Sequence, residues 1–165
     1  MLVFCGPEAV AADTPQPVHH PDLGHEHIPN PLFPHARYNS SPPSSGPHTS
    51  YTADWGVHQK PVADEILIHN LEHGGIVIAH RCGDCPDLVS ALEDLADGYE
   101  MIIIAPNPTV VSPIGLAAWG VTLSLERLDD AGKGAVADFI KKFHGIDHHP
   151  PGGHLHTAPP ATDSH

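Results

Sequence analysis

"EILIHNLEHGGIVIAH" (residues 65–80) combines strand-like runs with a polar segment at the centre of the chain. Two apolar runs, Ile66 to His69 and Gly75 to His80, flank a short polar segment. Short runs rich in Ile and Val are typical of buried strands. Gly74 and Gly75 follow the polar segment at once, and glycine disfavours a continuing helix. We therefore predict two strands joined by a tight turn that presents polar side chains.

The rest of the central region alternates between helical and strand patterns. A helix is predicted over residues 84–98, because Pro86 fits a first turn and Gly98 ends the apolar stripe. A buried strand follows over residues 101–106. Two more strands meet around Gly120, and a last amphipathic helix begins near Asp129 or Asp130. The predicted order is ββαβββα, an α/β (α+β) domain with a mixed sheet and two main helices.

The length of 165 residues suggests one domain with tails. We expect a possible signal-peptide remnant over residues 1–12 and a globular α/β domain over residues 63–145. Residues 13–62, which hold ten prolines and seven histidines, predict an extended arm that packs on the domain. Residues 146–165 are again rich in His and Pro and are predicted to be a disordered tail.

The net charge of the chain limits the kinds of molecule that we expect it to bind. Acidic residues outnumber basic ones 20 to 7, for a formal charge of −13. A nucleic-acid partner requires a basic face, and a polybasic membrane patch is equally missing from the sequence. No apolar run approaches the ~18 residues of a membrane helix. Acidity combined with sixteen histidines suits a cation as the partner.

The compartment is suggested by the N-terminus. Ala9-Val10-Ala11 fits a signal-peptidase cleavage pattern, although the positively charged region that should precede it is missing. We interpret the chain as extracytoplasmic, periplasmic or secreted.

His69, Glu72 and His73 have the spacing of an H-x-x-E-H zinc-peptidase helix. Residues four apart share one helix face, so both imidazoles would point the same way. The following glycines and the strand-like residues before them disfavour a long catalytic helix. We interpret the segment as a polar functional site, with an ordinary turn as the alternative and a peptidase as the least favoured one.

A second segment, YNSSPPSSGPH (residues 38–48), combines three prolines with a glycine. Such a loop is stiff, and stiffness holds His48 at a low entropic cost, which favours a ligand role. The alternative is a proline-rich linker that happens to contain a histidine.

Together these segments resemble a known family. YNSSPPSSGPH, GVH, IHNLEHGGIVIAH, PIGLAAWG and DFIKKFHG, over about residues 25–144, are similar to the family called domain of unknown function 3105. The resemblance implies a PP[ST]SGPH loop at Pro42 to His48 and an H[NS]LEHGG segment at His69 to Gly75. It also implies a histidine ahead of the tyrosine, which His27 or His25 would supply. The family's name gives no activity, so the resemblance implies a fold and a shared site rather than a reaction.

The chain departs from that family at one position. His58 stands where the family more often has a tyrosine after Gly-Val. The resemblance therefore does not imply that His58 is a shared ligand.

The predicted metal ligands are His27, His48, His69, His73 and Glu72. Neutral imidazole suits copper, zinc, nickel and iron. Glu72 would be either a further ligand or the acceptor that orients an imidazole N–H. We expect copper rather than zinc. A thioether from Met101 would favour Cu(I), although a methionine at the start of a central strand is more typical of the core.

Cys82 and Cys85 form a C-x-x-C between a predicted strand and a helix N-terminus, which resembles the thioredoxin layout. A helix N-terminus stabilises a thiolate. Pro113 would match the cis-proline of thioredoxin-like domains, but the helix that should precede it is missing. Three interpretations stay open: a thiol–disulfide oxidoreductase, a structural disulfide of an oxidising compartment, and a metal site with His80.

The function predicted from the sequence is an extracytoplasmic metal-binding protein with a histidine-rich site. Whether it is an enzyme is left open, with a binding protein favoured. Two other classes remain: a thioredoxin-like oxidoreductase that uses Cys82 and Cys85, and a non-catalytic structural or interaction module.

Overall fold

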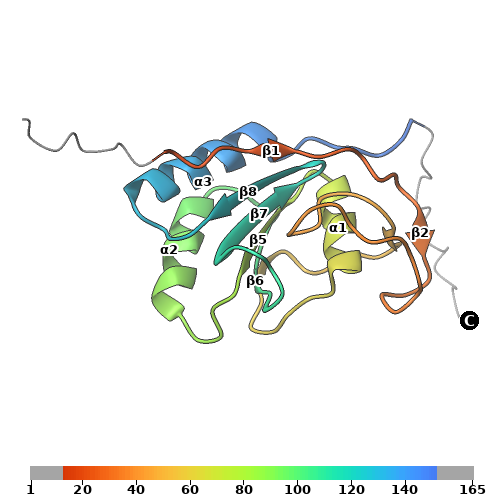
Figure 1. The fold of residues 1–165 in the computed structure, drawn as a ribbon, viewed down its shortest axis with the longest axis horizontal. Coiled ribbons are helices and arrows are strands. Elements are labelled where there is room, and N and C mark those ends of the chain that lie inside the picture. The colour runs from red at the N-terminus through yellow and green to blue at the C-terminus, as the bar shows by residue number, and fades with distance from the viewer. Residues whose placement is uncertain (1–12, 152–165) are drawn as a thin grey trace, which may run out of the picture.

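The computed structural model describes residues 13–151 of the chain. In this part of the chain, six strands form one sheet in the order β1-β8-β7-β5-β6-β4, and β2 pairs with β3 in a small separate sheet (Figure 1). The strands are β1 Val18–His19, β2 His27–Ile28, β3 His48–Thr49, β4 Gly56–Val57, β5 Ile76–His80, β6 Ile102–Pro106, β7 Ile114–Ala118 and β8 Val121–Leu125. The helices are α1 Asp64–Glu72, α2 Pro86–Ala96 and α3 Asp130–Phe143. The predicted mixed α+β class is confirmed.

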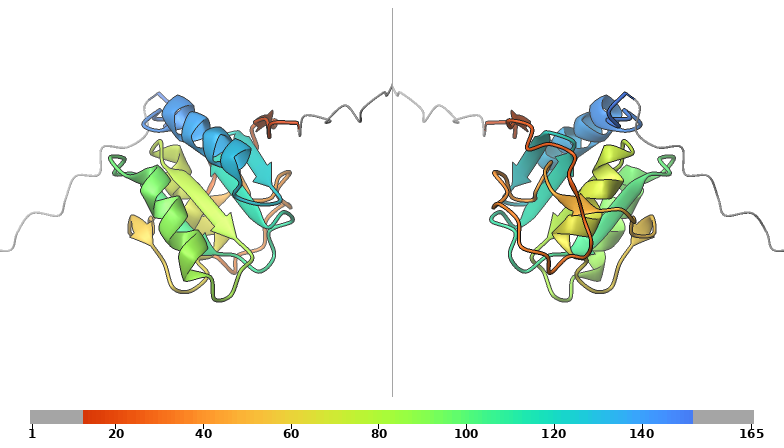
Figure 2. Two further views of the ribbon diagram at one scale, coloured as in Figure 1. Left: turned by 90° about the vertical axis from the view of Figure 1, so that its left-hand side faces the viewer. Right: turned by 90° about the vertical axis from the view of Figure 1, so that its right-hand side faces the viewer.

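The large sheet separates two apolar cores. Ile76 and Ile78 of β5 pack with residues of α2 and α3, whereas Val77 between them packs with α1. This alternation follows from the strand, whose successive side chains point to opposite faces. Figure 2 shows α2 and α3 on one side of the molecule, and α1 with the N-terminal arm on the other. The domain therefore has three layers, with β5 in the middle of the central one.

Both helices predicted after β5 are present, although α2 is two residues shorter at each end than the predicted range 84–98, and α3 begins at Asp130 as predicted. Pro86 occupies the first turn of α2, and Gly98 follows the helix with a φ of +84°. Asp129 caps α3 by accepting a hydrogen bond from the Gly132 N–H at 2.9 Å. The predicted strand pair around Gly120 is the antiparallel β7–β8 hairpin.

The predicted strand over residues 66–69 is wrong, because these residues lie inside α1. The order ββαβββα is therefore wrong at its first element, and the described chain has three helices instead of two main ones. A four-residue apolar run does not by itself distinguish a strand from a buried helix. Leu67, Ile68 and Leu71 form a helical stripe that packs on the sheet. The polar segment is thus the last turn of a helix, not a hairpin turn.

The proline- and histidine-rich arm contributes strands to both sheets. β1 pairs antiparallel with β8, and β2 pairs in parallel with β3, with His27 opposite His48. The Thr49 carbonyl of β3 accepts a hydrogen bond from Nδ1 of His69 in α1 at 2.7 Å. The arm consequently lies against α1. Residues 1–12, expected to be a signal-peptide remnant, and residues 152–165 of the predicted tail lie outside the described residues.

The thioredoxin comparison stays a prediction. β5, α2 and β6 form a parallel unit with Cys82 and Cys85 between β5 and α2, as that layout requires. Among residues 13–151, however, the cis peptide bond is Ser41–Pro42, so the bond before Pro113 is not cis. β6 leads directly to β7 without a helix.

Candidate metal centre

The last turn of α1 supplies three of the predicted ligands. His69 and Glu72 are buried, and the rings of His69 and His73 lie 4.9 Å apart, centroid to centroid. The two imidazoles four residues apart therefore share one face of the helix, as i and i+4 residues do. The C-terminal end of a helix carries a partial negative charge, which favours a cation there.

Two glycines let other segments approach this helix end. Gly74 has a φ of +87°, and a Cβ there would lie 2.8 Å from the Ile146 nitrogen. A Cβ on Gly75 would lie 2.6 Å from the Trp55 ring. Asn70 adds a clamp, because its side chain accepts from the Ala53 N–H at 2.9 Å and donates to the Ala53 carbonyl at 3.0 Å. The HNLEHGG segment is thus both a helix end and a packing junction.

The proline-rich loop holds His48 firmly. Ser45 Oγ accepts a hydrogen bond from the Leu23 N–H at 3.0 Å, and Tyr38 Oη donates to the Pro47 carbonyl at 2.6 Å. Gly46 has a φ of +120°, and a Cβ there would come within 3.2 Å of the Tyr38 ring. His48 itself is 0% exposed. These hydrogen bonds and the close packing at Gly46 account for the stiffness predicted for this loop.

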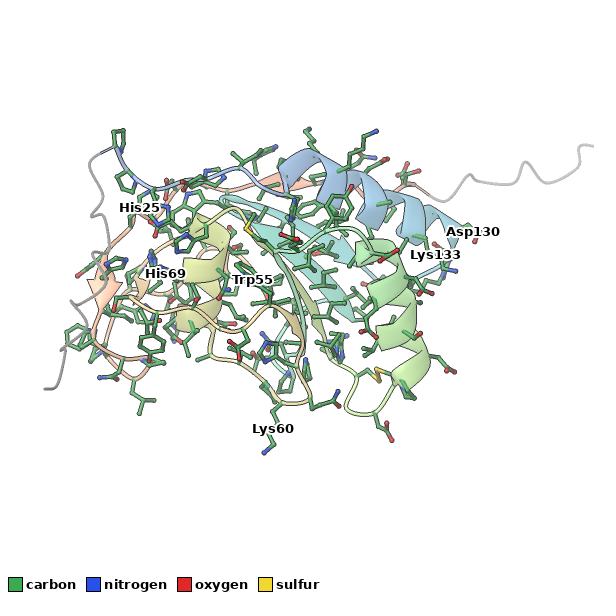
Figure 3. The ribbon with its side chains drawn as sticks, turned by 180° about the vertical axis from the view of Figure 1, so that it is seen from behind. His25, Trp55, Lys60, His69, Asp130 and Lys133 are labelled. Atoms are coloured by element: carbon green, nitrogen blue, oxygen red, sulfur yellow. A yellow bond between two sulfur atoms is a disulfide. The ribbon has the colours of Figure 1, made fainter. Side chains whose placement is uncertain are left out.

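Four residues from three segments meet at one point. His27, His48, His69 and Glu72 can each offer one ligand atom, and these atoms all lie within 4.8 Å of one another. We call these four residues the histidine cluster. Figure 3 shows the labelled His69 and His25 together at one end of the molecule, near α1 and the arm, with Asp130 and Lys133 of α3 at the other end.

Backbone carbonyls fix two of the rings. His48 Nδ1 donates to the Gly46 carbonyl at 2.7 Å, and His69 Nδ1 donates to the Thr49 carbonyl at 2.7 Å. Each ring then turns Nε2, with its lone pair, away from that carbonyl. Among residues 13–151, His48 Nε2 is buried and has no hydrogen-bond partner. Histidines that bind metals usually have their other ring N–H held in this way.

Burial keeps these imidazoles neutral. Desolvation, together with the neighbouring His48 and His73, lowers the pKa of His69 to about 4. Desolvation also lowers the pKa of His48, although the Gly46 hydrogen bond and Glu72 oppose this. Both rings therefore offer a lone pair at neutral pH, which is the form that binds a metal.

Glu72 is the anionic group of the site. Burial alone would raise its pKa, but the hydrogen bond from His25 and the nearby His48 and His149 outweigh this and lower it. His25 Nδ1 lies 2.5 Å from Oε1, while Oε2 lies 3.3 Å from His48 Nε2 and 3.5 Å from His149 Nε2. One oxygen is therefore held by His25, and the other faces the histidines.

Three residues of this site escaped the sequence analysis in whole or in part. His25, offered only as an alternative to His27, stacks on Trp119 with ring centroids 4.4 Å apart and binds Glu72. His149, assigned to the tail, forms a second group of possible ligands with His69 and His73. Trp119 packs in the same apolar core as α1 and is also the platform for the His25 ring.

Backbone hydrogen bonds bring His149 to the site. The Gly145 N–H donates to the Gly74 carbonyl at 2.8 Å, and the His148 N–H donates to the Glu72 carbonyl at 2.9 Å. The ring of His149 then lies 4.4 Å from that of His73. His149 could have been predicted only from the backbone hydrogen bonds that join residues 145–148 to the end of α1. The sequence does not reveal these hydrogen bonds.

The remaining candidates lie elsewhere. His58 Nε2 donates to the Asp54 carbonyl at 2.7 Å and belongs to neither group of possible ligands among the described residues. Cys82 and Cys85 form a disulfide at the far end of β5. No helix within residues 13–151 is long and apolar enough to cross a membrane.

The comparisons with known proteins give one match. The family model described as "Protein of unknown function (DUF3105)" matches residues 34–157. No curated protein and no solved structure matches the chain. The matched range covers the PPSSGPH loop, α1 and the segment that carries His149.

Proposed function

The chain belongs to the DUF3105 family, whose description gives no activity, and we propose from the site itself that it binds a transition-metal ion in the histidine cluster. His48 Nε2 carries the proposal. This buried nitrogen has no hydrogen-bond partner within the described residues, although His48 belongs to the group whose ligand atoms lie within 4.8 Å of one another. An unsatisfied buried polar group costs about 1–3 kcal/mol, which a bound ion would recover.

The spacing of the ligand atoms supports this proposal. Two ligands of one tetrahedral ion, each about 2.0–2.1 Å from it, lie about 3.3 Å apart. His48 Nε2 and Glu72 Oε2 lie 3.3 Å apart, and a neutral ring that donates its Nδ1–H to Gly46 has only a lone pair on Nε2. The separation is therefore that of two ligands of a shared ion. His27 and His69 complete a set of three imidazoles and one carboxylate.

The electrostatics favour a cation. With the buried histidines neutral, Glu72 leaves the cluster with one negative charge, and the C-terminal end of α1 adds a partial one. The whole chain carries a formal charge of −13. A divalent ion would neutralise the only buried carboxylate of the cluster.

We propose copper rather than zinc as the ion. Imidazole suits both, and at a given nitrogen and oxygen site Cu²⁺ binds more tightly than Zn²⁺. The cluster itself contains imidazoles and a carboxylate but no thiolate, because the two cysteines of the described chain lie at the far end of β5. The disulfide also supports an extracytoplasmic location, because such bonds persist mainly in oxidising compartments.

Metal stoichiometry of the full chain tests the proposal. Protein loaded with Cu²⁺ or Zn²⁺ and desalted in the presence of a weak chelator is compared with His48→Asn and His69→Asn. An asparagine amide can replace the Nδ1–H donor to the backbone carbonyl, but it removes Nε2. We expect about one ion per wild-type chain and an affinity at least ~100-fold lower in each variant, since even outer partners of a metal site cost 10–100-fold.

His58→Asn is the matched control, because His58 lies outside both groups of possible ligands. It should bind metal like the wild type. Equal metal contents in His48→Asn and the wild type would place the metal elsewhere, for example on the histidines of residues 152–165. If the wild-type protein retained zinc more tightly than copper, the choice of copper would be wrong, but the histidine cluster would still be the metal site.

A further inference from the structure

The disulfide lies apart from the histidine cluster. Cys82 follows β5, and Cys85 is the N-cap of α2, next to the Pro86 that begins the helix. In Figure 3 the yellow bond lies beside the first turn of α2. Both cysteines are partly exposed, and neither belongs to an apolar core. The bond closes a loop of only four residues, so it restricts the unfolded chain little.

His80 contacts the cysteine at the helix N-cap. His80 Nδ1 donates to the Cys82 carbonyl at 3.0 Å and lies 3.9 Å from Cys85 Sγ. A thiolate on Cys85 would therefore meet an N–H donor as well as the positive end of α2. Both features stabilise a thiolate.

A groove leads to the Cys85 side of the disulfide, and Cys82 is bonded to Cys85 and partly exposed. A cavity of about 330 Å³ is lined by His58, His80 and Cys85 among others. A second cavity of about 250 Å³ is lined by Trp55 and Tyr99 among others. The two cavities share Val57 and Glu93 as lining residues, so they adjoin.

The groove runs beside a sheet edge. β4 is the outermost strand of the large sheet on this side and pairs with β6. A Cβ added to Gly56 of β4 or to Gly83 of the disulfide loop would meet no described atom within 4 Å. An edge strand offers backbone groups to an extended segment of another chain.

We propose that the Cys82–Cys85 disulfide exchanges with a pair of cysteines in an extended segment of another polypeptide that docks in this groove. Glu93 and Glu100 line it together with Asp84, so basic residues near the cysteines suit it. Trp55 and Tyr99 suit an apolar side chain.

The exchange balances without a further reagent. A thiolate of the docked segment attacks the Cys82 sulfur, an S–S bond forms between them, and the Cys82–Cys85 bond breaks with its electron pair leaving on Cys85. The segment's second thiolate then attacks the segment's own sulfur in this mixed disulfide, and Cys82 leaves. The segment becomes a disulfide and the protein a dithiol. The two thiol protons of the segment pass through water to Cys82 and Cys85.

A single-turnover assay tests the redox step. The oxidised full chain with Cys5→Ser is mixed, without oxygen and with a metal chelator, with a synthetic ten-residue peptide that has two cysteines flanked by Lys and Leu. We expect one peptide disulfide per protein, and none with Cys82→Ser or Cys85→Ser. A wild-type rate equal to that of a small unstructured disulfide of the same loop sequence would overturn the proposal. The chelator makes the result independent of the histidine cluster.

Two charge reversals on neighbouring helix residues test the docking. Glu93 lines both cavities, whereas Asp94, equally exposed on α2, lines neither. Glu93→Lys should slow exchange with the Lys-flanked peptide about tenfold and speed it with a Glu-flanked one. Asp94→Lys should change neither rate by as much. Equal effects of the two substitutions would overturn the groove as the docking site.

His80 is proposed as a positioning residue for the Cys85 thiolate. In a Cys82→Ser background, the pH dependence of Cys85 alkylation gives the thiol pKa. His80→Ala should raise that pKa, and His80→Asn, which keeps a donor in the place of Nδ1, should largely restore it. Identical alkylation profiles in all three proteins would remove His80 from the proposal.

Discussion

Strand β5 connects two sites that are built in opposite ways. At its start, the histidine cluster takes side chains from the arm, the PPSSGPH loop and α1, and its ligand atoms are buried. At its end, Cys82 and Cys85 come from one loop and are partly exposed. The first site depends on long-range packing to exist, whereas the disulfide at the second site depends on only four consecutive residues. A disturbance of packing should therefore affect the first site far more than the second.

The largest effect on stability is expected from a substitution of Gly74, which lies between α1 and β5. Gly74→Ala introduces a Cβ 2.8 Å from the Ile146 nitrogen at a φ of +87°, so either residues 145–149 or the end of α1 must move. We expect a loss of about 3 kcal/mol in the free energy of unfolding, measured by urea denaturation, because strain and a backbone clash combine.

Gly98→Ala separates these two causes. Gly98 has a φ of +84° but no described atom within 4 Å of an added Cβ. It should cost about 1 kcal/mol, the strain of the left-handed conformation alone. Equal losses for the two substitutions would mean that the close approach of residues 145–146 to α1 contributes nothing.

The sequence predicts the disulfide site better than the histidine cluster. The reason is that the cysteines are close together in the sequence, whereas the residues of the cluster are far apart. Cys82, Cys85 and Pro86 are adjacent, so the C-x-x-C at a helix N-terminus is visible directly. The glycines of HNLEHGG also mark a break correctly. The short run before them, however, predicted a strand where α1 lies, since four apolar residues fit either element.

His149 shows most clearly what cannot be predicted from local sequence patterns. It reaches the cluster only because residues 145 and 148 donate backbone hydrogen bonds to Gly74 and Glu72. No local pattern encodes that pairing, so the composition of the segment predicted a tail. His48 was predicted as a candidate because prolines stiffen its own loop, which is a local property.

Metal binding gives the next largest effect, and it tests whether the two ends of β5 are independent. Free metal at about 100 times its dissociation constant should raise the free energy of unfolding by about 2.7 kcal/mol, if it binds only the folded chain. With a ~100-fold weaker affinity, the rise should fall to about 0.4 kcal/mol or less in His48→Asn, and it should persist in the Cys82→Ser/Cys85→Ser variant. Denaturation curves with and without metal measure it, and a rise that disappears in the cysteine variant would show that the two sites are coupled.

Reduction of the disulfide should have a smaller effect. A crosslink that closes a four-residue loop contributes about 2 kcal/mol in the chain-entropy relation, and less where the unfolded chain stays partly ordered. We expect the reduced chain to keep its fold and its metal stoichiometry, as circular dichroism and elemental analysis would show. Loss of bound metal on reduction would contradict the separation of the two sites.

The smallest effect concerns pH, and it distinguishes the buried end from the exposed one. The pKa of His69 falls to about 4 in the folded chain, so below pH 6.5 the unfolded chain binds more protons and the folded state loses stability as the pH falls. Between pH 7 and pH 6 this histidine alone should cost the metal-free protein about 0.7 kcal/mol, taking an unfolded pKa of 6.5. His69→Asn should remove that part of the slope. A wild-type slope equal to that of His69→Asn, in paired denaturation curves at the two pH values, would mean that the His69 ring is accessible to protons and that the cluster is more open than its burial indicates.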